Sequence, residues 1–229
     1  MLNKLLTVKT SCHHGDSQFE NQLEPAKLLT NYDMIEIDFV YHQGQFISSH
    51  DYDESIQKGS LLKDWIDFII KEDKILWIDL KDDPVSIFLP QFSKLDIVAL
   101  IYQLDQYKLI YDQLEEHVLI SCQYHTIYEQ LMNLDSSYTI IRDLPKDKFY
   151  VMDILIPDFL TSQAKLLMTP EITLDIGHSK IVAIDQQFFT DETLMDFINH
   201  CFDVIIVYTY KQTKYIQSEK HIIYQYDFN

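Results

Sequence analysis

The chain has 229 residues, of which 47% are hydrophobic and 13% aromatic, and its formal net charge at pH 7 is −18. This length and apolar content suit one large core, so we expect residues 1–229 to form a single domain. The negative charge repels nucleic acid and anionic membranes, and the 18 Lys and Arg residues are scattered rather than gathered in a basic patch. We therefore exclude nucleic acid as a partner.

The sequence also lacks the features of a membrane or secreted protein. No stretch approaches the roughly 20 uninterrupted apolar residues of a membrane helix. The apolar run at Met1–Leu6 contains a lysine and is too short for the core of a signal peptide. The three cysteines lie far apart, which fits neither a disulfide framework nor a zinc site. We expect a cytoplasmic protein without stable membrane insertion, whose oligomeric state the sequence leaves open.

Short runs rich in Ile and Val recur along the chain and are typical of buried parallel strands. They lie at Leu5–Val8, Met34–Val40, Ile75–Leu80, Val118–Cys122, Tyr138–Ile141, Ile181–Ile184 and Val204–Tyr208, with Ile222–Tyr226 as a candidate eighth strand and Phe149–Leu160 as a further candidate. Apolar residues at helical spacing predict helices over Leu61–Ile69 and Leu95–Leu114. About eight such units favour a (β/α)₈ barrel of the TIM type, which could be irregular, over an open sheet.

One segment departs from this alternation. The strand that begins at Met34 is followed by His42-Gln43-Gly44-Gln45 and then by Phe46–Asp51. A strand, a turn containing Gly and a second apolar run are typical of a hairpin. The return strand would bring His50 back towards the strand that precedes the turn.

Acidic residues interrupt two of the predicted strands. Glu36 and Asp38 are two positions apart, so both side chains point to the same face of a strand. Asp79 repeats the anomaly near the end of the strand at Ile75–Leu80. For one acid alone an ion pair at a strand end is the commoner explanation, but three acids on neighbouring strands favour a metal site. Carboxylate oxygens suit one Mg²⁺ or Ca²⁺ ion better than zinc.

Histidines are predicted at the same end of the barrel. His13 and His14 follow the first predicted strand, and His50 would return there on the hairpin. Two imidazoles beside a phosphodiester could act as general acid and base, or one could attack phosphorus, although a lone loop histidine is usually structural or solvated. Lys81, two residues after Asp79, could contact a phosphate oxygen, and a surface salt bridge is equally consistent with its position.

Five short motifs follow one another over residues 13 to 81. They are His13-His14-Gly15, Glu20-Asn21, Glu36-Ile37-Asp38, His50-Asp51 and Ile78-Asp79-Leu80-Lys81. In this order the chain resembles the glycerophosphodiester phosphodiesterase superfamily, whose pattern runs His-Arg-Gly, Glu-Asn, Glu-hydrophobic-Asp, His-Asp and a strand ending acid-hydrophobic-Lys. Asp in the last motif, in place of the commoner Glu, also resembles the sphingomyelinase D-like branch. The rest of the chain matches only in its βα rhythm and at the strand Val204–Tyr208.

The resemblance implies a role for each matched residue. One divalent ion, Mg²⁺ or Ca²⁺, would bind Glu36, Asp38 and Asp79. His13 and His50 would form the catalytic pair. The attacking group in such enzymes is generally a neighbouring hydroxyl of the substrate, or water at a later step.

The resemblance also implies roles at the edge of the pocket, and the chain departs from the pattern there. Lys81 and His14 would face the substrate phosphate, and Glu20 would support the pocket rim. His14 stands where the superfamily has Arg, so a bidentate phosphate contact is missing. The short interval between the last two motifs implies that no large inserted subdomain is present. Tyr208 replaces a Trp expected on the penultimate strand.

We therefore predict a metal-dependent phosphodiesterase of lipid metabolism that cleaves a glycerophosphodiester or a related (lyso)phospholipid headgroup, which is a small-molecule substrate. Two alternatives stay open. A phospholipase D-like enzyme acting on membrane lipid would need an exposed apolar loop near the active face. A catalytically silent barrel that binds a phosphorylated ligand or a protein partner is supported by the replaced Arg, but the retained acidic residues and histidines argue against it.

Overall fold

The structure, a computed structural model, describes residues 2–13, 31–50, 54–81, 90–122, 139–144, 181–185, 199, 203–208 and 220–227. Nine strands in these ranges form one sheet, in which β3 is antiparallel to β2 and the other eight strands pair in parallel. The parallel strands are β1 (Thr10–His13), β2 (Met34–His42), β4 (Ile75–Leu80), β5 (Val118–Cys122), β6 (Thr139–Leu144), β7 (Ile181–Asp185), β8 (Val204–Tyr208) and β9 (His221–Asp227).

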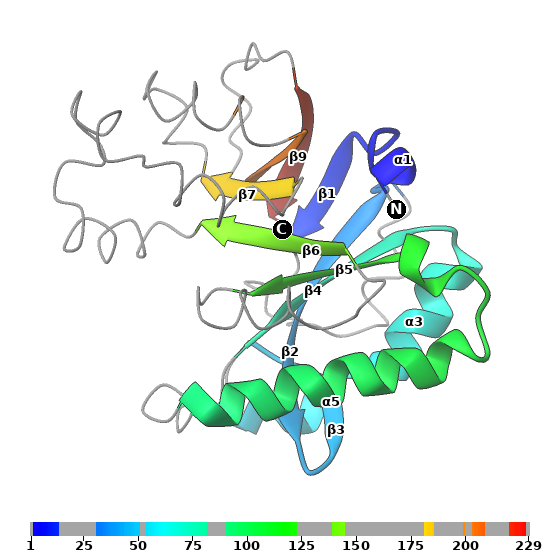
Figure 1. Cartoon of the computed structure of the whole chain (residues 1–229), viewed down its shortest axis with the longest axis vertical. Coiled ribbons are helices and arrows are strands. Elements are labelled where there is room, and N and C mark those ends of the chain that lie inside the picture. The colour runs from blue at the N-terminus through cyan, green and yellow to red at the C-terminus, as the bar shows by residue number, and fades with distance from the viewer. Residues whose placement is uncertain are drawn as a thin grey trace, which may run out of the picture.

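Hydrogen bonds link these strands into a closed ring. Their order is β1-β9-β8-β7-β6-β5-β4-β2, and β1 also pairs with β2 (Figure 1). This confirms the predicted (β/α)₈-type barrel. The strands predicted from Met34 onward are present with ends that differ by a few residues, whereas Tyr138 and Phe149–Leu160 lie outside the described residues.

The predicted hairpin is also present. Strand β3 (Gln45–Ser48) runs antiparallel to β2, with His42 opposite Gln45 and Phe39 opposite Ser48. The two turn residues, Gln43 and Gly44, have φ of 50° and 84°. A two-residue turn with positive φ at both positions matches the right-handed twist of the flanking strands. The return strand ends at Ser48, earlier than the predicted Asp51, which lies outside the described residues.

Two helices cover the outer face of the barrel beside β2, β4 and β5 (Figure 1). Helix α3 (Leu62–Lys71) follows the short 3₁₀ helix η1 (Glu54–Lys58), and helix α5 (Pro90–Lys108) precedes a second one, η2 (Leu114–Glu116). Helix α5 ends six residues before the predicted Leu114, which is buried and begins η2 after Gln113, where φ is 63°. Among the described residues, none of the helices has the length and apolar character to cross a membrane.

Alternate residues of each strand face different layers. On β2, Ile35, Ile37 and Phe39 are buried with Trp65 of α3 and Leu104 of α5 in the core outside the barrel. This alternation follows from the two-residue period of a strand. The intervening positions of β2 therefore face the barrel interior. One of them, Met34, belongs to a second core with residues of the other strands, namely Ile75, Trp77, Leu119, Ile181, Val204, Ile206 and Ile223.

The prediction of a first strand at Leu5–Val8 is wrong. Helix α1 spans Leu2–Leu5, and the first strand is the polar segment Thr10–His13. Leu5 and Val8 are 0% and 3% exposed, whereas Leu6 between them is 47% exposed. This spacing of three residues is helical, and both buried side chains pack into the barrel core at the N-terminal ends of the strands. The apolar run therefore covers the N-terminal end of the barrel core and is not one of the strands.

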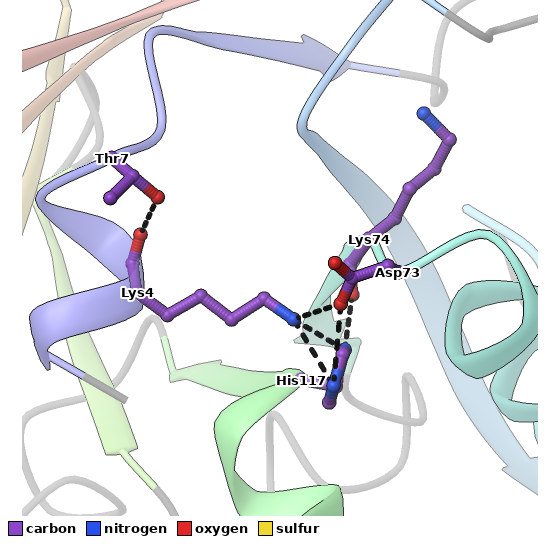
Figure 2. A network of polar contacts seen from close by, with 5 residues as sticks. All are labelled: Lys4, Thr7, Asp73, Lys74 and His117. Carbon is purple, nitrogen blue, oxygen red and sulfur yellow. Dashed lines mark hydrogen bonds and ion pairs between the residues drawn. The ribbon is translucent and has the colours of Figure 1, made fainter.

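A polar network holds α1 against the loops at this end of the barrel. Lys4 Nζ donates to Asp73 Oδ1 at 2.7 Å and lies 2.9 and 3.1 Å from the ring nitrogens of His117 (Figure 2). The Nδ1 atom of His117 is 2.7 Å from the carbonyl oxygen of Lys74, and the Thr7 hydroxyl donates to the Lys4 carbonyl at 2.6 Å. The network therefore joins α1 to the segments that enter β4 and β5.

Candidate metal and catalytic site

The register of β2 and β4 brings three carboxylates together at the other end of the barrel. Asp38 and Asp79 are partners in the parallel ladder, and Glu36 lies one inward position before Asp38. Each residue offers one carboxylate oxygen, and these oxygens all lie within 4.8 Å of one another. Glu36, Asp38 and Asp79 are 4%, 0% and 4% exposed. Three buried carboxylates this close repel one another strongly unless positive charge is nearby.

Lys81 supplies part of that charge. Its Nζ lies 2.9 Å from Asp38 Oδ1 and donates a hydrogen bond to Asp79 Oδ2. Burial by itself would lower the pKa of the Lys81 ammonium, but the negative charges of Asp79, Asp38 and Glu36 outweigh it and hold this pKa well above its usual value. One ammonium does not balance three carboxylates.

The three acidic residues fit a divalent cation. Asp38 is fully buried, and neither of its carboxylate oxygens accepts a hydrogen bond from the part of the chain that the structure describes. Buried carboxylates normally have several such partners, whereas the charged contact of Asp38 with Lys81 reaches only Oδ1. A cluster made only of carboxylate oxygens matches the preference of Mg²⁺ and Ca²⁺. The donor atoms and their spacing therefore suit either ion.

The hairpin ties the segment of His50 to the same strand. The backbone N–H of Ser49 donates to the carbonyl oxygen of Asp38 at 3.0 Å, so the residue before His50 is bonded to a member of the acidic cluster. His50 is exposed at the C-terminal end of the barrel strands. The hairpin thus returns the backbone just before His50 to Asp38, in the direction that the hairpin pattern predicts.

Two hydrogen bonds between Ser48 and Ser60, which the sequence does not reveal, fix the end of the hairpin. The Ser48 N–H donates to the Ser60 carbonyl at 2.9 Å, and the Ser60 N–H donates to Ser48 Oγ at 2.8 Å. Gly59 lies so close that a Cβ atom there would be 2.1 Å from the Ser48 carbonyl oxygen. Only glycine fits at this approach. The signal in the sequence is faint: Gly59 is one of four glycines and stands shortly before α3.

The backbone of His13 reaches the cluster from β1. His13 is the last residue of that strand and not a loop residue after it, and its ladder partners are Glu36 on β2 and Asp227 on β9. The side chain of His13 lies outside what the structure describes, as do His14 and Glu20 altogether. Their predicted roles stay predictions.

The barrel interior next to the acidic residues contains polar side chains that could not be placed from the sequence. Trp77 is the ladder partner of Glu36, and Ser11 pairs with Gln225 across β1 and β9. The Trp77 indole nitrogen and the Ser11 hydroxyl are buried without a hydrogen-bond partner among the described residues. No motif marks these positions, because their placement follows only from the register of the closed ring.

A closed ring of parallel strands, with acidic residues at the C-terminal ends of two of them, defines a (β/α)₈-type barrel with a candidate cation site. Solved structures of glycerophosphodiester phosphodiesterases share this fold. The chain matches the one from Agrobacterium tumefaciens at TM-score 0.57 and 13% identity, over 96% of this chain and 95% of that one. One from Parabacteroides distasonis matches at TM-score 0.59 and 12% identity, over 95% of this chain and 92% of that one.

A second structure from Parabacteroides distasonis, a glycerophosphoryl diester phosphodiesterase, matches at TM-score 0.53 and 13% identity, over 95% of this chain and 82% of that one. No family model and no curated protein matches the sequence. At these identities the likeness establishes the fold, and function is argued from the site.

Proposed function

We propose that the protein is a metal-dependent phosphodiesterase that releases an alcohol from a glycerophosphodiester or from a related (lyso)phospholipid headgroup. One observation carries the proposal: three buried carboxylates, with Lys81 among them, lie at the C-terminal end of the barrel, where barrel enzymes have their active sites. The fold is that of solved glycerophosphodiester phosphodiesterases. In this proposal the acidic cluster and Lys81 belong to the active site of a phosphoric diester hydrolase.

The three acidic residues hold the cation in this proposal. Glu36 and Asp38 present oxygens from β2, and Asp79 presents one from β4. A bound Mg²⁺ or Ca²⁺ supplies Lewis-acid stabilisation of the charge on the phosphoryl oxygens. The chain's own residues select an anionic group in spite of the net charge of −18, because Lys81 provides positive charge at the cluster itself.

His13 and His50 move the protons. One imidazole accepts the proton of the attacking hydroxyl, from the substrate or from water, while the new bond to phosphorus forms. The other, in its protonated form, donates a proton to the leaving alcohol oxygen while its bond to phosphorus breaks. The hydrogen bond between the Ser49 N–H and the Asp38 carbonyl supports the position of His50 at the rim.

The remaining predicted residues orient the substrate. Lys81 and His14 contact phosphate oxygens, and Glu20 supports the pocket rim in this proposal. A lysine binds phosphate as a point charge, whereas an arginine at the position of His14 would do so with two parallel hydrogen bonds. We therefore expect weaker substrate binding than an arginine would give, and a KM that falls in the variant His14→Arg.

The test is the release of free alcohol from glycerophosphocholine, glycerophosphoethanolamine and lysophosphatidylcholine, with Mg²⁺, Ca²⁺ or EDTA. We expect turnover that depends on the metal and is abolished in Glu36→Gln and in His50→Ala. The control is Asp73→Asn, which removes a carboxylate at the opposite end of the barrel. Turnover that persists in EDTA would contradict the role of the metal. Metal binding without turnover on any substrate would instead favour a silent binding protein.

A further inference from the structure

Lys81 is anchored so that its ammonium group reaches into the acidic cluster. It directly follows β4, and its backbone N–H donates to the carbonyl oxygen of Phe39 on β2 at 2.8 Å. From this fixed point its Nζ lies 2.9 Å from Asp38 Oδ1 and donates to Asp79 Oδ2. The contacts join the cation to one residue from each of the two strands that form the cluster.

A divalent ion and this ammonium group need the same oxygens. The cluster offers oxygens within 4.8 Å of one another, a span that an ion with metal–oxygen distances of about 2.0 to 2.6 Å can bridge. Lys81 already contacts two of the three residues. Two cations cannot share a buried set of oxygens without strong mutual repulsion, so occupancy by one disfavours occupancy by the other.

We propose that Lys81 is a built-in competitor for the metal site, which leaves Asp38 and Asp79 when the ion binds and then faces the substrate phosphate. This inference rests on the proposed function, because it takes the cluster to be the metal site. The Lys81 side chain is 18% exposed, whereas that of Asp38 is fully buried, so the lysine side chain reaches solvent and the carboxylate does not. A flexible four-carbon stem allows the ammonium to move while its Cα stays fixed.

The exchange explains how the cluster tolerates its own charge. The ammonium offsets the repulsion among three buried carboxylates before the ion arrives. Its departure then places a positive charge near the bound substrate only when the metal is in place. Phosphate attraction is thereby linked to metal occupancy.

The first measurement is metal affinity by titration calorimetry, after treatment with EDTA and dialysis. The variant Lys81→Met removes the ammonium and keeps most of the side-chain volume, and we expect it to bind Mg²⁺ and Ca²⁺ about tenfold or more tightly than the wild type. Lys63→Met is the matched control, because Lys63 pairs with Asp67 on the exposed surface of α3. An affinity in Lys81→Met that is equal to or weaker than that of the wild type would overturn the competition.

The second measurement separates exchange from a fixed neighbouring charge. An amine-reactive reagent, with labelling of each lysine quantified by mass spectrometry, reports access to Lys81, and Lys63 is the internal reference. We expect labelling of Lys81 in the wild type to rise several-fold on saturation with Mg²⁺, and to fall again when inorganic phosphate is added. Unchanged labelling of Lys81 while Mg²⁺ binds would overturn the exchange and leave the proposed function intact. Absence of metal binding by both wild type and Lys81→Met would instead contradict the proposed function.

Discussion

Asp38 and Asp79 occupy the same level of two adjacent parallel strands, so their carboxylates meet inside the barrel with Lys81 between them. Neither residue could leave this arrangement without a shift of the ladder, because Leu80 and Phe39 are partners at the next position and both are buried on the outer face. The packing of the outer core therefore sets the geometry of the acidic cluster. The first prediction follows from this relationship.

We expect Asp38→Asn to lower the affinity for Mg²⁺ by more than about 100-fold, since it replaces a charged ligand in direct reach of the ion and weaker perturbations outside the ligands already cost 10 to 100-fold. Its stability in EDTA should change little, because it also removes one of three mutually repelling charges. Calorimetry and thermal unfolding check both statements. Equal metal affinity in Asp38→Asn and wild type would remove this residue from the proposed ligand set.

The close approach of Gly59 to Ser48 at the end of the hairpin gives a second prediction. We expect Gly59→Ala to destabilise the fold by about 1 to 3 kcal/mol, because its Cβ would meet the Ser48 carbonyl oxygen at 2.1 Å and the backbone must shift. Since Ser48 precedes the segment that holds His50, kcat should fall as well. Gly44→Ala is the control: a Cβ there meets nothing within 4 Å, but φ is +84°, so it should cost about 1 to 2 kcal/mol of stability without loss of kcat.

The segment Leu5–Val8, which covers the N-terminal end of the barrel core, gives a third prediction. We expect Leu5→Ala to lower the free energy of unfolding by about 2 to 5 kcal/mol, because Leu5 is fully buried in the barrel core. Leu6→Ala should change it by less than about 0.5 kcal/mol, because Leu6 is exposed. Urea unfolding of the two variants checks the contrast. Similar losses for both would contradict a helical turn at this position.

The network around Lys4 gives a prediction with a pH dependence. A hydrogen bond from Lys4 and the positive charge of Lys4 lower the pKa of Asp73, and burial opposes them only weakly. A carboxyl with a lowered folded pKa contributes stability above its unfolded pKa of about 3.9, and this contribution is lost as the pH falls through the folded value. The Asp73 side chain is 85% exposed, so we expect less than about 1 kcal/mol.

Lys4→Met is the variant that tests this network. The difference in stability between pH 7 and pH 3 should be smaller in Lys4→Met than in the wild type, by about the contribution of the Asp73 pair. Lys71→Met is a matched control, because Lys71 pairs with Glu72 and its side chain is 81% exposed. An equal pH dependence in wild type and Lys4→Met would show that the contact does not persist in solution.

The strands of the barrel could be predicted where several apolar residues follow one another, as in Val204–Tyr208 and at the start of Ile75–Leu80. The first strand could not, since Thr10–His13 is short and polar and its pairing comes from β2 and β9. The nearby apolar run Leu5–Val8 resembles a strand in the sequence because only two of its residues, Leu5 and Val8, show the helical spacing.

The acidic cluster could also be predicted, because Glu36 and Asp38 follow the two-residue period of a strand and Asp79 breaks an otherwise apolar one. The contact of Lys81 with both aspartates could not be derived, since it depends on the register between β2 and β4. The same holds for the approach of Gly59 to Ser48, which joins two segments through tertiary structure alone.

The ring closes where β1 lies between β2 and β9. The strands that carry the carboxylates and the strand that carries His13 therefore complete their pairing at different stages of folding. The carboxylates come from β2 and β4, which pair in the ladder and are separated along the chain only by β3, η1 and α3, so they can assemble early. His13 pairs with Glu36 on β2, but its other ladder partner, Asp227, lies nearly the whole chain away, so that side of β1 is paired only when the last strand docks. A nascent chain that still lacks β9 would thus already present its acidic residues to a cation, while β1 would have a partner on only one side.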